Sequence, residues 1–384
     1  MADKQQNSVD IENWLKLIHA DGVGPVTFAK LIKYFGSVDR SLCASINELA
    51  KINGIGLKTA EQIARTRDEF NTAAELELAD KLGVWLINID DPRYPAVLKR
   101  IYDPPPILYI KGTLTKSDNL AAAIVGARRC SLYGQEQASR IAHLLAAAGF
   151  TICSGMARGI DTAAHQGALA SGGRTIAVQG CGLANIFPPE NKKLFELISN
   201  SGAVVSELPL RCEPLAENFP SRNRIIAGLS LATIVIEAGL NSGSLITAKI
   251  AMENNREVMA VPGKIDSPLS KGSNRLIKDG AKLVDSIEDI MEGLGYIGIQ
   301  LQDHASEATA KAINKLETPT MDINQLKLTD SEKTVHSCIN KEPLHIEQIV
   351  TQTSLQPGII NSCLISLQLK GLVKQLQGSM FIRN

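Results

Sequence analysis

Residues 150–168 read FTICSGMARGIDTAAHQGA. Their apolar start predicts a short buried strand, and their alanine-rich end predicts a helix. Between the two lie Gly155, Arg158, Gly159 and Asp161. One interpretation is a tight strand-to-helix turn in which the glycines take positive φ and the aspartate caps the helix. The other is a loop that binds an anion at the start of the helix.

The same succession of strand, small-residue turn and helix recurs along the chain. Short apolar strands are expected at residues 121–125, 150–153, 175–178, 203–205, 233–236 and 258–261, with amphipathic helices between them, such as 135–148 and 244–254. This alternation predicts an α/β fold with a doubly wound, Rossmann-like parallel sheet. In such a sheet, ligands bind beyond the carboxyl ends of the strands.

The turns after these strands are rich in glycine, serine and arginine, and they predict a phosphate-binding rim. The candidate residues of this rim are Gly126, Arg128, Arg129, Ser154, Gly155, Arg158, Gly159, Asp161, Gly180, Gly182, Arg222, Asn223, Arg224, Ser242, Gly243 and Ser244. We expect Arg128 and Arg224 to be exposed. We expect Ser221 to cap the helix that contains Arg222 and Arg224. We expect Asp161 to cap its own helix or to orient an arginine, and His165 to be structural.

Three common ligand classes do not fit this edge. The GxxxxGK[ST] string of a P-loop is absent, and the first strand is followed by GARRCS instead of the GxGxxG of a dinucleotide site. The six histidines have no metal-ligand spacing. The sequence therefore predicts a phosphate-rich ligand held by arginines and backbone amides, without a cofactor or a metal.

Composition restricts the partners and the compartment. The chain has 40 Lys and Arg against 40 Asp and Glu, so an anionic partner must be held by a local patch. Seven cysteines without a CxxC pair indicate a reducing compartment. The amino terminus lacks the apolar core of a signal peptide, and no apolar run reaches the ~20 residues of a membrane helix. We therefore expect a cytoplasmic protein without a membrane partner.

Residues 1–83 are predicted to form a small helical, helix-hairpin-helix or SAM-like domain. The segments 17–36 and 49–65 each place a Gly-x-Gly turn before an amphipathic helix. This pattern is typical of non-sequence-specific DNA binders, because free backbone N–H groups can hold a phosphate there. Such paired hairpins also serve as packing or protein-contact modules, and the sequence leaves both alternatives open.

Residues 84–298 are assigned to the Rossmann-like domain, and the proline-dense stretch at its start, 87–112, is expected to be extended. Residues 299–325 are predicted to be a linker. Residues 326–384 predict three short helices and a hairpin, an order typical of a winged-helix domain. Its supposed recognition helix is Pro357–Lys370, and Lys370 is the only basic residue in it. This composition favours a protein contact over the reading of DNA.

Five segments in this order closely resemble the DprA/Smf family (DNA-processing protein A). They are VGARRCSLYG (125–134), SGMARGIDTAAH (154–165), FPSRNRIIAGLS (219–230), EAGLNSGSLITA (237–248) and VPGKIDSPLSKGSNRLIKDGA (261–281). The resemblance covers about 90–295, and the flanking domains agree with longer members. It implies a bacterial protein of natural transformation that binds single-stranded DNA, displaces or works beside single-strand binding protein, and loads the recombinase RecA. It also implies a homodimer and no catalysis.

By motif, the resemblance places eight residues in the family's DNA pocket: Arg128, Gly155, Arg158, Gly159, Asp161, Arg222, Asn223 and Arg224. The chain departs from the family at Phe187–Pro188, where a Tyr-Pro is common, so a phenol hydroxyl is missing. Candidate dimer contacts are Met252, Leu276 and Ile277, on two helices beside the last strands of the sheet.

An enzyme is the alternative. Nucleoside-monophosphate N-glycosidases of the lysine-decarboxylase-like superfamily also have glycine-rich strand ends and phosphate-binding arginines. They use a PGGxGT-type loop with a nearby glutamate. The corresponding segment here, AGLNSGSLITA, lacks the paired glycines, although Glu237 directly precedes it.

Overall fold

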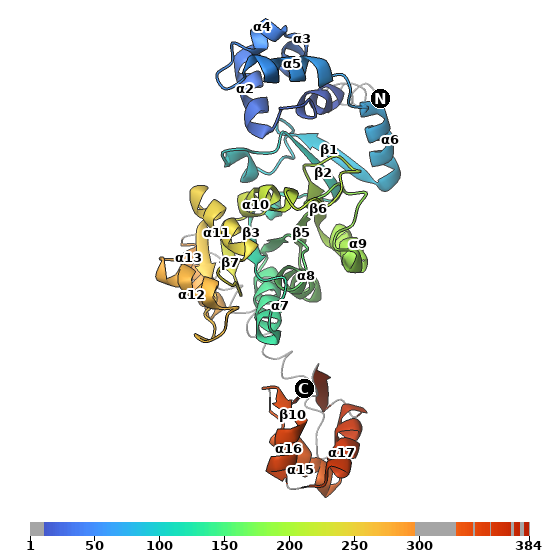
Figure 1. Ribbon diagram of the computed structural model, residues 1–384, viewed down its shortest axis with the longest axis vertical. Helices are drawn as coiled ribbons and strands as arrows, with labels where there is room; N and C mark the ends of the chain where they lie inside the picture. Colours follow the sequence, from blue (N-terminus) through green and yellow to red (C-terminus); the bar gives the residue numbers. More distant parts are fainter. Residues whose placement is uncertain are drawn as a thin grey trace. The chain divides into compact units, whose positions relative to one another are not determined.

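The structure is a computed structural model that divides into two compact units, which are described separately (Figure 1). It describes residues 11–295, 328–340, 342–353, 355–369, 372–376 and 380–383. The first of these ranges belongs to the first unit, and the others belong to the second. The predicted linker, residues 299–325, lies outside the described residues.

A nine-stranded sheet in the order β1-β2-β6-β5-β4-β3-β7-β8-β9 forms the centre of the first unit. Its strands are β1 (Val84–Asn88), β2 (Ile107–Gly112), β3 (Ala121–Val125), β4 (Thr151–Ser154), β5 (Thr175–Val178), β6 (Ala203–Ser206), β7 (Ala232–Val235), β8 (Glu257–Ala260) and β9 (Lys282–Leu283). From β6 to β9 all neighbouring strands are parallel. The six predicted parallel strands and the α/β fold class are confirmed.

The two strands at the other end of the sheet were not predicted. β1 pairs antiparallel with β2, and β2 pairs antiparallel with β6. Both strands fall within or beside the proline-dense stretch that was expected only to be extended. Its prolines lie between the two strands and not inside them, so they do not interrupt the backbone hydrogen bonds of the ladder.

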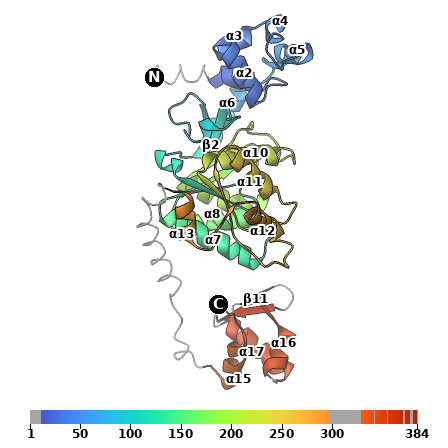
Figure 2. The same cartoon turned by 90° about the vertical axis from the view of Figure 1, so that its left-hand side faces the viewer.

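Helices cover both faces of the parallel strands, as the doubly wound prediction requires (Figure 2). One face packs against α7 (Leu132–Ala147), α8 (Ile160–Ala170) and α13 (Ile287–Gly293). The opposite face packs against α10 (Asn218–Leu229), α11 (Gly243–Glu253) and α12 (Lys271–Lys278). Because successive side chains of a strand point to opposite faces, the side chains on both faces of the central strands are buried, and these strands are mostly apolar.

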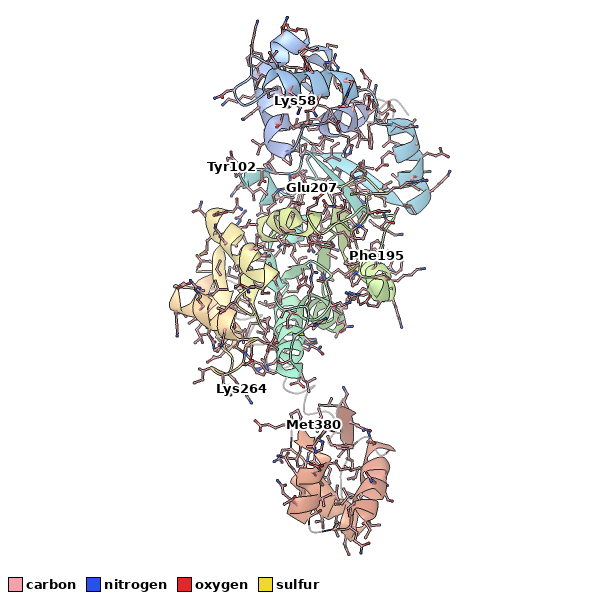
Figure 3. The ribbon with its side chains drawn as sticks, in the orientation of Figure 1. Lys58, Tyr102, Phe195, Glu207, Lys264 and Met380 are labelled. Atoms are coloured by element: carbon pink, nitrogen blue, oxygen red, sulfur yellow. The ribbon has the colours of Figure 1, made fainter. Side chains whose placement is uncertain are left out.

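The amino-terminal helices form the expected helix-hairpin-helix arrangement, with α2 (Pro25–Phe35), α3 (Val38–Cys43), α4 (Ile46–Leu49), α5 (Leu57–Thr66) and α6 (Thr72–Leu82). Gly24 and Gly56 precede α2 and α5 as their N-cap residues. The core of these helices continues into the sheet through α9 (Lys192–Ser201), where Phe195 is buried (Figure 3). The helices and the sheet therefore belong to one compact unit.

The second unit has the predicted winged-helix arrangement. Its elements are α15 (Asp330–Cys338), β10 (Leu344–His345), α16 (Ile346–Thr353), α17 (Pro357–Leu369), β11 (Val373–Leu376) and β12 (Met380–Arg383). The strands form a small sheet in the order β10-β12-β11. Val335, Ile349, Leu367 and Phe381 meet in its core. None of the helices in the described parts of either unit combines the length and apolarity needed to cross a bilayer.

A buried ion pair joins the amino ends of the central strands. Asp118, three residues before the start of β3, is only 5% exposed. Its carboxylate accepts hydrogen bonds from Nε and Nη2 of Arg174, both at 2.9 Å, and from Oγ1 of Thr151 at 2.8 Å. Arg174 also donates to the backbone carbonyl oxygens of Thr113 and Ser201. This network fixes the starts of the strands, at the edge opposite to the predicted rim.

Replacing Asp118 with Asn should lower the free energy of unfolding of the first unit by about 3 kcal/mol, because Arg174 loses its buried counter-charge. The matched control is Glu77→Gln, which removes the exposed ion pair with Lys81 and should cost less than about 0.5 kcal/mol. The chain has two tryptophans, Trp14 and Trp85, both in the first unit, so fluorescence during urea unfolding reports on this unit. Equal losses in the two variants would contradict the structural role of the network.

Candidate functional site

A pocket of about 560 Å³ opens at the carboxyl end of β3, between α10 and α11. Nine predicted rim residues line it: Gly126, Arg128, Arg129, Asp161, Arg222, Asn223, Ser242, Gly243 and Ser244. Asn223 Nδ2 donates to the carbonyl oxygen of Gly243 at 3.5 Å, which joins the two helices across the pocket. Ser242 is the N-cap of α11, so the start of this helix faces the cavity.

A smaller recess adjoins this pocket. Gly155 and Arg158, two further rim residues, line it together with the Phe187–Pro188 pair. Arg128 and Phe219 line both the recess and the larger pocket. The rim predicted from the sequence is therefore two connected hollows that share one arginine and one aromatic ring.

Arg222 is buried in the wall of the larger pocket, with 4% of its surface exposed. A Cβ atom on residue 155 would overlap Nη1 of this arginine, so only glycine leaves room for the guanidinium. Burial lowers the pKa of Arg222 to about 10, while the nearby Asp161 opposes that change. Within the described part of the chain, its Nε and Nη1 have no hydrogen-bond partner. The site thus holds a desolvated cation with unused donors.

Asp161 is the charge that faces Arg222. Burial raises the pKa of Asp161, and the arginine opposes this effect. Its Oδ2 accepts hydrogen bonds from the backbone N–H groups of Gly155 at 3.1 Å and Ala157 at 3.4 Å. Of the two roles expected of Asp161, the cap of α8 is wrong, because the N-cap is Gly159, at φ +76°; the other role, beside an arginine, agrees with its interaction with Arg222. The carboxylate instead holds the preceding loop in shape and lies beside the buried guanidinium.

Phe219 was not among the predicted site residues, although it occupies the centre of the site. The guanidinium carbon of Arg128 lies 5.3 Å from the centre of its ring, and that of Arg222 lies 5.9 Å away. The ring of Phe187 is 5.5 Å from it, centre to centre. Phe219 stands three residues before Arg222 on α10, so the two share a helix face. That three-residue spacing could have indicated from the sequence that Phe219 lies beside Arg222 in the site.

Arg224 does not belong to the pocket, and its predicted exposure is wrong. It is 7% exposed, and it donates to Asp103 Oδ2 at 2.9 Å and to Glu207 Oε2 at 2.6 Å. Glu207 follows β6 (Figure 3), and burial raises its pKa. Ser221 is not a cap either, because α10 begins three residues earlier, at Asn218.

Four other predicted residues line neither hollow and support the site from behind. Ser154 donates to the carbonyl oxygen of Ile124 at 2.7 Å. The others lie against neighbouring groups: Gly159 against the carbonyl oxygens of Ala127 and Arg128, Gly180 against the ring of Phe219, and Gly182 against the carbonyl oxygens of Pro209 and Leu210.

His165 lies in the interior, one turn along α8 from Asp161. Its Nδ1 is 2.6 Å from Oγ1 of Thr175, and burial lowers its pKa to about 3. The histidine is therefore neutral and packed in the interior, in agreement with the structural role predicted for it.

Glu237, which the enzyme alternative would need, is buried behind the pocket. Its Oε2 accepts a hydrogen bond from the backbone N–H of Ser131 at 2.7 Å, and its Oε1 accepts one from the hydroxyl of the same residue at 2.8 Å. Both oxygens of this carboxylate thus hold the loop after β3 in place.

Sequence models of known families match three parts of the chain. The model described as "DNA recombination-mediator protein A" matches residues 85–295, "DprA winged helix domain" matches 319–379, and "SAM-like Helix-hairpin-helix tandem" matches 15–67. Protein Smf of Synechocystis is 36% identical, with 96% of this chain and 98% of that protein covered. DNA processing protein DprA of Streptococcus pneumoniae is 40% identical, with 68% and 90% covered.

Two solved structures are similar. The crystal structure of DprA from Streptococcus pneumoniae has a TM-score of 0.66 and 37% identity, with 73% of this chain and 97% of that chain covered. DNA processing protein A from Helicobacter pylori has a TM-score of 0.50 and 30% identity, with 57% and 96% covered. The second structure concerns the single-stranded DNA binding mode of the Helicobacter pylori protein.

Replacing Arg224 with Ala should destabilise the first unit by about 3 kcal/mol, because Asp103 and Glu207 lose the cation between them. Arg158→Ala, which removes a half-exposed ion pair, should lower the free energy of unfolding by less than about 1 kcal/mol. Urea unfolding of the two variants measures the difference. If Arg224→Ala unfolded like the parent protein, its carboxylate contacts would contribute nothing to the fold.

Proposed function

This chain belongs to the DprA/Smf family of DNA-processing proteins, and we propose that it binds single-stranded DNA in the pocket between α10 and α11. We further propose that it loads RecA onto that DNA during natural transformation, beside single-strand binding protein and in the cytoplasm. The DNA-binding part is supported by the site and by the Helicobacter pylori relative. The parts that concern RecA, single-strand binding protein and the compartment are supported by the family resemblance and by the composition of the chain.

The buried guanidinium of Arg222 is the observation that carries the proposal. A desolvated cation with unpartnered N–H groups costs free energy, and an acceptor oxygen of a ligand would recover part of that cost. Arg128 and Arg129, which are exposed and also line the pocket, can pair with phosphate oxygens. The amino end of α11 adds backbone donors for an anion.

Phe219 favours a single strand over a duplex. Base stacking on an aromatic ring is typical of single-strand binding, whereas the bases of a duplex already stack on one another. Two guanidinium groups, those of Arg128 and Arg222, lie near this ring and can add cation–π attraction for bound bases. The chain has no net charge, so binding depends on these few local contacts and not on a broad positive surface.

We propose binding without covalent chemistry. The two oxygens of Glu237 are engaged by Ser131, which supports a structural role for this glutamate over the catalytic role in a nucleotide N-glycosidase. A general acid or base must instead reach the proton that it transfers. The candidate dimer contact also remains part of the proposal. Met252 is 53% exposed on α11, whereas Leu276 and Ile277 pack partly against the core, so Met252 is the better residue for testing assembly.

A titration with a short oligo-dT and with a blunt duplex of equal length, at two salt concentrations, tests the proposal. We expect tighter binding to the single strand, because only its bases are free to stack on Phe219. Affinity should fall with salt, with a slope of roughly −0.7 per phosphate contact. Equal affinity for the two DNAs would contradict the proposed specificity.

Replacing Arg128 with Ala should weaken oligo-dT binding about tenfold, because one charge-assisted contact is lost. Arg93 gives a matched control: it also lies over an aromatic ring, 5.0 Å from that of Trp85, and it also carries one positive charge. It does not line the pocket, so Arg93→Ala should bind as the parent protein does. An equal loss in both variants would mean that only total charge matters, and that the pocket is not the binding site.

A further inference from the structure

One arginine of the proposed DNA site is already paired with a carboxylate of its own chain. Arg158 Nε donates to Oε1 of Glu190, and Nη2 donates to Oε2 at 3.1 Å. This hydrogen bonding raises the pKa of Arg158 and lowers that of Glu190. By contrast, Arg128 and Arg129 form no ion pair within the described residues. Arg158 therefore differs from the other exposed arginines of the site.

The surrounding backbone holds this pair in place. Glu190 lies in the short 3₁₀ helix η3 (Pro189–Asn191). The next residue, Asn191, is buried, and its Nδ2 donates at 2.9 Å both to the carbonyl oxygen of Met156 and to Oγ1 of Thr162. These two acceptors lie on either side of Arg158 in the sequence. This buried contact therefore holds the backbone that carries Glu190 beside the segment that carries Arg158.

The pair lies where a bound strand would pass. Arg158 lines the small recess with Arg128 and Phe219, and the same ring lines the larger pocket. A carboxylate and a phosphate present two oxygens to a guanidinium in the same way. Glu190 therefore occupies the Nε–Nη2 edge of Arg158 as a phosphate of the DNA would occupy it.

We propose that Glu190 competes with DNA phosphate for Arg158 and thereby weakens one phosphate contact of the site. This inference rests on the proposed binding of single-stranded DNA. A phosphate that reaches Arg158 must displace the carboxylate or bind beside its negative charge, and both cost free energy. The consequence is a bound strand that dissociates more readily than the number of arginines alone would predict.

The test is oligo-dT titration of Glu190→Gln, which keeps the shape of the side chain and removes its charge. Affinity should rise about three- to tenfold, the effect of one charge removed near a phosphate in a partly solvated site. The salt slope should steepen by roughly 0.7, the value for one further phosphate contact on a single strand. The matched control is Glu292→Gln, which removes another ion-paired exposed carboxylate, that of the pair with Lys282, and should leave affinity unchanged.

A double variant separates competition from a general charge effect. The double variant Arg158→Ala/Glu190→Gln should bind oligo-dT no more tightly than Arg158→Ala alone, because Glu190 then has no arginine to withhold from the DNA. Unchanged or lower affinity of Glu190→Gln would overturn the inference, and lower affinity would show that Glu190 positions Arg158 for DNA. A double variant that bound more tightly than Arg158→Ala alone would also overturn the inference, because the effect of Glu190 would then not depend on Arg158. If the parent protein bound no single-stranded DNA, the proposed function itself would be rejected, which is a distinguishable result.

Discussion

The site depends on a guanidinium buried between a glycine and an aspartate. Arg222 fits only because residue 155 has no side chain, and Asp161 supplies the facing negative charge. The same aspartate binds the backbone N–H of Gly155, so one carboxylate fixes both the loop and the electrostatic environment of the cation. Burying a charge is costly unless it is compensated, and here the compensation within the described chain is incomplete. In our proposal, the DNA completes it.

Two arginines that look equivalent in the RNR segment have different tasks. Arg222 and Arg224 are two residues apart on α10, so their side chains point roughly 200° apart around the helix axis. One reaches the pocket, and the other is held by Asp103 and Glu207. The second arginine fixes the helix that carries the first.

The sequence was informative where the signal was local. Apolar runs that end in small residues located the six parallel strands. Of the sixteen site residues predicted at the carboxyl edge of these strands, eleven line the two hollows. Contacts between distant segments could not be inferred. The Arg158–Glu190 pair joins residues 32 apart, and the partners of Arg224 are 17 and 121 residues away. Phe219 was missed because its role depends on how α10 crosses the carboxyl ends of the strands.

The central claim is that single-stranded DNA enters the hollows around Arg222 and Phe219. A crystal structure of the chain with a short oligo-dT tests it most directly. The account predicts a base against the ring of Phe219, an acceptor oxygen of the DNA at Arg222, and a phosphate near Arg128. DNA bound instead to the hairpins before α2 and α5, or to the winged-helix unit, with the pocket between α10 and α11 free of DNA, would contradict it.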